Sequence, residues 1–282
     1  MEKSIVHKET GSLWVRPFKV RMICTDVCCK IYGGILISLI SLIAFSVHAD
    51  AWTSSSSASR QAVVVKTDNW TAHQGRLHFY ERSSPKDDIW RPVGEAIPVV
   101  VGRNGLGWGV GLHPAAGMDT HREGGPGKRE GDGRAPAGIF RLGGAFGYSP
   151  PGKYAWIRLP YHEATPSLRC VDDAQSRHYN RIVDTSLINP DWKSDEEMLR
   201  GDDQYRLGII VDHNANPVIP GRGSCIFMHI WKGAEAGTAG CTAMSQENME
   251  RLLRWLDPTA NPILIQLPAA TYKQLRPVWG LP

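Results

Sequence analysis

The sequence predicts a mainly β fold with a smaller helical part, on three observations. From residue 62 onward, three segments rich in β-branched and aromatic residues follow one another and are separated by turn-forming residues: 62–68, 75–83 and 96–105. Two further apolar runs, 205–214 and 224–230, predict buried strands. After Cys241, apolar residues recur at helical spacing, which predicts one amphipathic helix.

The first three segments form the β-rich start of the fold, and a glycine-dense region, 102–144, follows them. Within it, the run GLGWGVG (105–111) has glycines at alternate positions. This spacing fits neither the dinucleotide-binding nor the phosphate-loop pattern, so a kinked strand is expected there. The run APAGIFRLGG (135–144) predicts a short closing strand, and WKSDEEMLRG (192–201) predicts a short helix capped by Ser194.

The helix after Cys241 has the clearest limits. Ser245 is its predicted N-cap, and Asp257-Pro258 ends it. Its buried face follows the i, i+3, i+4, i+7 pattern through Met249, Leu252, Leu253 and Leu256. The run 261–268, NPILIQLP, predicts a final strand.

The N-terminus has the composition of an export signal. In 1–49, basic residues precede the apolar run 31–47, which ends in the small-residue pattern VHA. We expect cleavage after Ala49 and a periplasmic protein; an uncleaved inner-membrane anchor is the alternative, because 17 apolar residues are the lower limit for a spanning helix. A Ser-rich linker (50–61), one domain (62–268) and a C-terminal tail (269–282) follow.

The charge of the exported part gives no reason to expect nucleic acid as a partner. The leader holds six of the 32 basic and three of the 28 acidic residues, which leaves +1 (26 − 25). No basic stripe interleaved with aromatic residues is present either.

Three cysteines lie outside the leader: Cys170, Cys225 and Cys241. The natural pair is Cys170 with Cys225, as a disulfide that would stabilise by roughly 4 kcal/mol in the chain-entropy model. The alternative is that both are reduced core residues. No C-x-x-C or H-E-x-x-H pattern occurs after the leader, so no metal site is expected.

Cys241 has the setting of a nucleophile. A thiol just ahead of a helix lies near the positive end of the helix dipole, which lowers its pKa. His229, twelve residues earlier at the end of a predicted strand, is placed to accept the thiol proton if the intervening loop folds back. The backbone amides of Gly240 and Cys241 are candidates for holding an oxyanion. The alternative is that Cys241 is a small buried hydrophobe and His229 a satisfied polar residue.

The stretch from His229 to Met244 resembles the L,D-transpeptidase catalytic domain (YkuD) family. His229, Gly240 and Cys241 match its motif, and Thr238 stands where the motif has serine. APAGIF (135–140) resembles the family's Thr-Pro-x-Gly-x-Phe strand, and 62–101 resembles its opening strands. Ile230, Ala239 and Ala243 depart from the motif, the last two as in a divergent branch without the second motif histidine.

The resemblance implies a β-sandwich of mixed sheets with a helix following the catalytic cysteine, and no cofactor. Cys241 would attack a peptidoglycan stem peptide next to meso-diaminopimelate, with His229 as general base and a thioester as intermediate. Three functions stay open: a transpeptidase, a cysteine peptidase or amidase that cuts peptidoglycan or a lipoprotein link, and a non-catalytic wall-binding module. Weaker candidates for substrate contacts are Thr238, His213, Trp231 and the pair Asp172-Asp173.

Overall fold

The computed structural model describes residues 58–114 and 124–282. The predicted signal segment and residues 50–57 of the predicted linker lie outside the described residues. The described residues belong to one compact unit. Within the described part of this unit, no helix is long and apolar enough to span a bilayer.

The opening strands form where the sequence predicts them. β1 (Gln61–Thr67) pairs antiparallel with β2 (Gln74–Glu81), which pairs with β3 (Arg91–Val100). The apolar side chains of β1 are buried because the strand lies inside the sheet, paired on its other edge with β13 (Ile263–Pro268). The predicted final strand is therefore parallel to the first.

β5 (Ala135–Gly147) is much longer than the short strand expected at 135–144. Its first part pairs with β13 and its second part with β10 (Leu207–Val211). The register shifts between Ile210 and Val211, where Gly143 is passed over. A β-carbon at Gly143 would lie 2.6 Å from the Asp212 carboxylate, so glycine is needed for this bulge.

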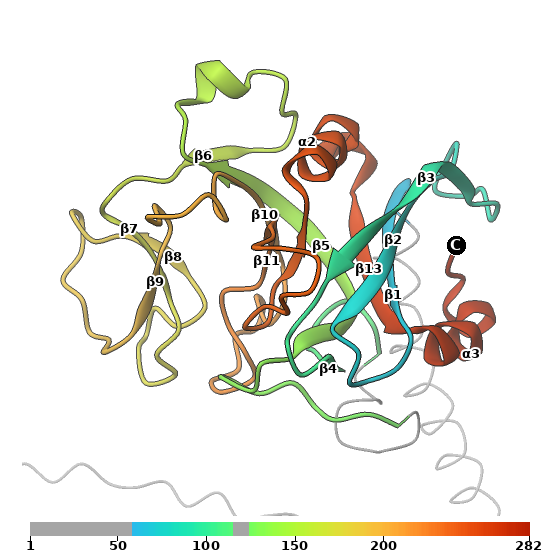
Figure 1. Ribbon diagram of the computed structural model, residues 1–282, viewed down its shortest axis with the longest axis horizontal. Helices are drawn as coiled ribbons and strands as arrows, with labels where there is room; N and C mark the ends of the chain where they lie inside the picture. The colour runs from blue at the N-terminus through green and yellow to red at the C-terminus, as the bar shows by residue number, and fades with distance from the viewer. Residues whose placement is uncertain (1–57, 115–123) are drawn as a thin grey trace, which may run out of the picture. The chain divides into compact units, whose positions relative to one another are not determined.

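The main sheet is mixed and its pairings close on themselves. β10 also pairs with β11 (Phe227–Ile230), which is parallel to β12 (Thr242–Met244), and β12 returns to β3. The short β4 (Leu106–Trp108), within GLGWGVG, pairs with β5. Figure 1 shows the strands surrounding a shared interior, which holds the main hydrophobic core. The family-implied fold class, mainly β with mixed sheets, is confirmed.

A smaller sheet is inserted between β5 and β10 and lies beside β10 and β11 (Figure 1). After a 3-10 turn, η3 (Pro151–Tyr154), and β6 (Tyr161–Glu163), the chain forms β7 (Leu168–Val171), β8 (Ile182–Asp184) and β9 (Asp195–Glu197). The order of the small sheet is β8-β7-β9.

The helix predicted at 192–201 is wrong, because β9 occupies its centre. Its residues pair antiparallel with β7, and the Arg169 guanidinium forms ion pairs with Asp195 at 3.3 Å and Glu197 at 3.4 Å. Strand pairing with β7, an earlier and separate segment of the chain, therefore prevails over the local capping signal.

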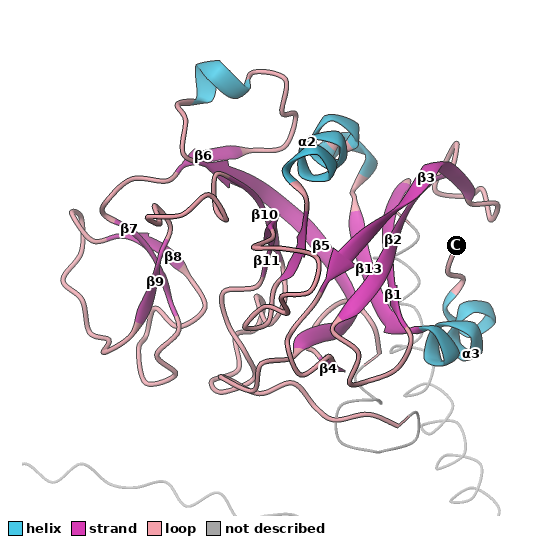
Figure 2. Cartoon of the chain, in the orientation of Figure 1, coloured by secondary structure: helices cyan, strands magenta, loops and turns pink. Residues whose placement is uncertain are grey.

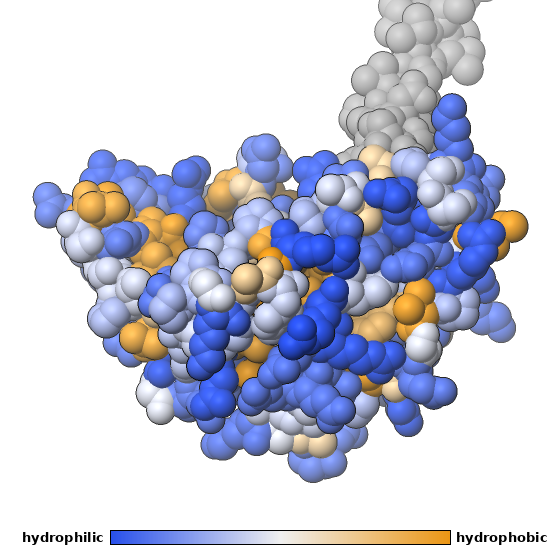
Figure 3. All heavy atoms as spheres, turned by 90° about the horizontal axis from the view of Figure 1, so that it is seen from above, coloured by the Kyte–Doolittle hydropathy of each residue, from blue (hydrophilic) through white to orange (hydrophobic). Residues whose placement is uncertain are grey.

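The predicted helix after Cys241 is α2 (Gln246–Trp255), and the Ser245 side chain caps it by accepting from Asn248 N at 3.3 Å. The predicted tail, 269–282, forms a second helix, α3 (Ala269–Trp279), which contacts β1 and β13 and buries Tyr272, Leu275 and Trp279. A 3-10 turn, η4 (Pro258–Ala260), follows α2 (Figure 2). Figure 3 looks onto the end with η3 and α2, where hydrophilic side chains predominate.

Candidate functional site

Cys241 immediately precedes β12, and α2 begins only at Gln246. The helix follows Cys241 as the sequence predicts, but a three-residue strand, held by parallel pairing to β11, lies between the thiol and the helix start. Cys241 is buried, with 6% of its surface exposed. Its sulfur accepts a hydrogen bond from Phe227 N at 3.3 Å and donates to the Cys225 carbonyl at 3.6 Å.

The electrostatic environment of Cys241 favours the neutral thiol. Burial raises its pKa to about 12, and the charge of Glu196 acts in the same direction. The hydrogen bond from Phe227 N lowers the pKa but does not compensate. The expected lowering of the thiol pKa by a helix dipole is thus reversed, because a desolvated thiolate costs more than one amide recovers.

His229 lies on β11 and is 4% exposed. Its Nδ1 is 2.8 Å from the Ile230 carbonyl oxygen. A carbonyl only accepts, so Nδ1 carries the proton and Nε2 is the basic nitrogen. Burial lowers the pKa of His229 to about 4, against the raising effect of the Ile230 hydrogen bond. The imidazole is therefore neutral at pH 7, and it makes a T-shaped contact with the Tyr205 ring, with centroids 5.2 Å apart.

The parallel pairing of β11 with β12 brings His229 and Cys241 to the same place. Met228 lies opposite Thr242 and His229 opposite Ala243, and the loop between the strands folds back as the sequence argument requires. Both side chains line one cavity of about 350 Å³. Among the described residues no hydrogen bond joins the two, because the thiol is engaged with Cys225.

Thr238 shapes the turn that precedes Cys241. Its hydroxyl donates to the Cys241 carbonyl at 2.6 Å and accepts from Gly240 N at 3.1 Å. Thr238, Gly240 and Cys241 all line the cavity. The Gly240 amide, a predicted oxyanion donor, is thus bound to Thr238 in this state.

Two of the candidate substrate contacts are not brought to the cavity. His213 is buried and does not line the cavity; its Nδ1 accepts from Val110 N at 3.3 Å, and its Nε2 lies 3.0 Å from the Arg222 carbonyl oxygen. Burial lowers its pKa to about 3. Trp231 is outside the lining, and its backbone N–H donates to Met244 O.

The Asp172-Asp173 pair divides between two environments. Asp172 lines the cavity, whereas Asp173 accepts from the backbone N–H groups of Gln175 and Lys193 outside it, each at 2.9 Å. Adjacent carboxylates in the sequence thus have separate roles, one in the cavity and one in a turn.

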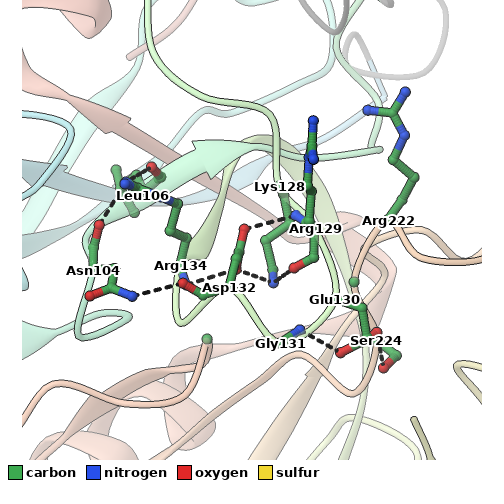
Figure 4. Close-up of polar contacts among 12 residues, drawn as sticks. Asn104, Leu106, Lys128, Arg129, Glu130, Gly131, Asp132, Arg134, Arg222 and Ser224 are labelled. Atoms are coloured by element: carbon green, nitrogen blue, oxygen red, sulfur yellow. Dashed lines mark hydrogen bonds and ion pairs between the residues drawn. The ribbon is translucent and has the colours of Figure 1, made fainter. Parts of the chain in front are cut away.

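Several charged residues of the cavity have no signal in the sequence that connects them to Cys241. Lys128 and Glu130 come from the glycine-dense segment, and Glu196 and Arg200 come from the region expected to be helical. Figure 4 shows Lys128 directed at Asp132 and the Arg129 carbonyl, and Glu130 directed at Ser224. Tertiary contacts between these distant segments assemble this wall, among them the bond from the Ser224 hydroxyl to Glu130.

A disulfide joins the inserted sheet to the segment before β11. The sulfurs of Cys170 and Cys225 are 2.12 Å apart, and the Cα atoms are 5.9 Å apart. Cys241 is the free cysteine of the described residues. Cys225 has φ of 53°, and its N–H donates to Asn180 Oδ1 at 2.9 Å, so its carbonyl is fixed toward the Cys241 thiol. Within the same described part, no group of three or more His, Cys, Asp or Glu could hold a metal ion.

The family model of the L,D-transpeptidase catalytic domain (YkuD) matches residues 71–265, which include β2 through the first half of β13 and both His229 and Cys241. No curated protein matches this chain.

Proposed function

Since the chain belongs to the L,D-transpeptidase catalytic domain (YkuD) family, we propose that it is a cysteine L,D-transpeptidase that uses Cys241 as nucleophile and His229 as general base. The family acts on peptidoglycan stem peptides. One observation carries the assignment of residues: the free thiol of the described residues and a histidine with a basic Nε2 line the same cavity.

The reaction starts from a neutral pair. The thiol leaves the Cys225 carbonyl and transfers its proton to His229 Nε2, and the sulfur attacks the stem-peptide carbonyl next to meso-diaminopimelate. The tetrahedral oxyanion is held by the amides of Gly240 and Cys241, which requires Gly240 to release Thr238. The C–N bond then breaks, the leaving amine takes the proton from His229, and a thioester remains. An acceptor amine attacks this thioester, which restores the thiol.

The cellular setting is proposed from the leader alone. Its basic residues, apolar run and VHA pattern support export, cleavage after Ala49 and work in the periplasm. A wall-linked lipoprotein is one acceptor that fits this setting. N-terminal sequencing of the exported protein tests the cleavage, and a chain that keeps residues 31–47 contradicts it.

A cysteine peptidase or amidase on the same scaffold is the second candidate. It is favoured by Ala239, which lines the cavity where the family motif has a histidine. A methyl group there leaves space for water and no side chain to position an amine. Product analysis separates the two functions: crosslinked or amine-exchanged stems indicate transfer, and only shortened stems indicate hydrolysis.

The test of the mechanism is a mass measurement on intact protein incubated with a tetrapeptide stem. We expect an acyl adduct on Cys241 in the parent and none in Cys241→Ala. His229→Ala should slow acylation by about 10²- to 10⁴-fold, the usual contribution of a positioned base. His162→Ala, at an exposed histidine on β6, is the matched control and should leave the rate unchanged. Undiminished turnover by Cys241→Ala would exclude the thioester mechanism.

A further inference from the structure

The Cys225 carbonyl accepts a hydrogen bond from the Cys241 thiol at 3.6 Å, and its direction depends on an uncommon backbone conformation. Cys225 has φ of 53°, in the left-handed region that residues with a β-carbon rarely adopt. A return to the ordinary region would redirect this carbonyl, since the backbone dihedral angles set its direction. The contacts that hold Cys225 therefore decide which acceptor the thiol meets.

Two contacts hold Cys225 in place. Its side chain is bonded to Cys170 of β7, and its backbone N–H donates to Asn180 Oδ1 at 2.9 Å. The disulfide restrains the side chain, whereas Asn180 binds the backbone of the residue whose carbonyl faces the thiol. Asn180 does not line the cavity, so any effect that it has on Cys241 passes through Cys225.

The side chain of Asn180 uses both its donor and its acceptor on backbone atoms. Its Nδ2 donates to the carbonyls of His213 at 2.9 Å and Asn214 at 2.8 Å, while Oδ1 accepts from Cys225. These partners lie at the two ends of the connection between β10 and β11, so one amide ties both ends together. Asn180 itself has φ of 59°, and its N–H donates to the Val171 carbonyl at 2.8 Å, which fixes it to the end of β7.

The Cys225 carbonyl favours the neutral form of Cys241. A carbonyl oxygen only accepts hydrogen bonds, so it can bond to the thiol and not to the thiolate. A hydrogen bond that only the neutral form makes opposes ionisation. The ionisable groups around the thiol come from several elements, and a change at Asn180 alters none of them: Glu196 on β9, Tyr205 before β10, His229 on β11 and Lys128 before β5.

We propose that Asn180 is a positioning residue that keeps the Cys241 thiol protonated in the resting protein by holding the Cys225 carbonyl toward it. The inference deepens the proposed function and rests on it, because this thiol is the proposed nucleophile. Asn180 thus limits the reactivity of the thiol while no substrate is bound. It lies between β7 and β8, outside the His229–Met244 stretch.

The test is alkylation of Cys241 by iodoacetamide between pH 7 and pH 10, in the full chain without reductant and followed by peptide mapping. Asn180→Gly removes the side chain and places there a residue that adopts the left-handed conformation readily. Alkylation of Cys241 should be about tenfold faster than in the parent at each pH. This corresponds to a profile displaced by about one pH unit to lower pH, because the thiolate fraction below the pKa rises about tenfold per unit.

The shape of the pH profile separates this role from a merely structural one. If Asn180→Gly only opened the fold, the exposed thiol would ionise with its ordinary pKa of about 8.5, and the alkylation rate would level off above about pH 9. A faster rate that keeps rising to pH 10 supports the inference. A profile that levels off, or one that coincides with that of the parent, overturns it.

Two further variants serve as controls. Asn180→Asp retains an oxygen acceptor for the Cys225 N–H and loses both donors, so it should keep the slow profile of the parent. Asn261→Gly is the matched control, because Asn261 also has a left-handed φ, of 49°, is exposed and does not line the cavity. Cys241 in this variant should react at the rate of the parent. Alkylation of Asn180→Asp as fast as Asn180→Gly, or an equal acceleration in Asn261→Gly, contradicts a role through the Cys225 N–H.

The acyl adduct with a tetrapeptide stem is measured separately in the parent. A displaced alkylation profile of Asn180→Gly without an adduct in the parent contradicts the proposed function alone, since alkylation needs no substrate. An adduct together with an undisplaced profile contradicts the role of Asn180 alone.

Discussion

In the resting protein Cys241 is a protonated thiol, hydrogen-bonded to the Phe227 amide and the Cys225 carbonyl. Its pKa of about 12 and the pKa of about 4 for His229 have the same physical origin, since burial disfavours the charged form of each. A thiolate–imidazolium pair is therefore not the resting state. In the proposed mechanism the proton therefore passes from Cys241 to His229 as the sulfur attacks the substrate carbonyl.

This resting state predicts slow alkylation of Cys241 by iodoacetamide. Because the thiolate is the reactive form, its fraction, and with it the rate, should rise about tenfold per pH unit between pH 7 and 9 without reaching a plateau. The control is the protein unfolded in urea without reductant, in which the exposed thiol should react faster. Rapid alkylation of the folded protein at pH 7 would show that the thiolate is present before substrate binds.

At the scale of elements, the inserted sheet β8-β7-β9 acts as a wall of the cavity. The disulfide from Cys170 to Cys225 spans 55 residues and joins this sheet to the segment that leads into β11. The same segment contacts Cys241 through the Cys225 carbonyl. The disulfide thus fixes the wall to the segment whose carbonyl accepts from the nucleophile.

Replacing both cysteines, Cys170→Ser with Cys225→Ser, should lower the free energy of unfolding by about 4 kcal/mol, the loop-entropy contribution for this separation. Urea denaturation of the parent and the double variant measures the difference. A reductant should destabilise the parent and leave the double variant unchanged. Equal midpoints and slopes for the two proteins would contradict a stabilising role.

At the scale of the whole molecule, buried histidines couple stability to pH. Three of them, His113, His213 and His229, have pKa values lowered by burial to about 4, 3 and 4. Protonation therefore favours the unfolded chain, where the histidine pKa is near 6.5. Their contribution is complete above pH 6.5 and is lost as the pH falls toward 4. Glu196 and Asp212, whose pKa values are raised, oppose this trend in part.

We expect the free energy of unfolding to fall by several kcal/mol between pH 7.5 and pH 5. Chemical denaturation at the two pH values, at constant ionic strength, measures it. His162→Ala, at an exposed site, should show the same pH dependence as the parent. An equal free energy of unfolding at both pH values would mean that protonation of the buried imidazoles has no net effect on stability.

The sequence by itself determined those strands and helices that depend on residue patterns within their own segment. β1, β2 and β13 are predicted by their own runs of β-branched and apolar residues, and α2 by its N-cap and its periodic apolar face. The unpaired thiol, the glycine before it and the family motif also single out Cys241 and His229, and both line one cavity.

Only the tertiary structure decided the properties that depend on contacts between distant segments. The pairing of β9 with β7 turned a predicted helix into a strand and brought Glu196 into the cavity. Insertion of β12 between Cys241 and α2 removed the helix N-terminus from the thiol, and burial reversed the direction of its pKa shift. Desolvation and long-range strand pairing depend on residues from the whole fold, so a local pattern of residue types cannot predict them.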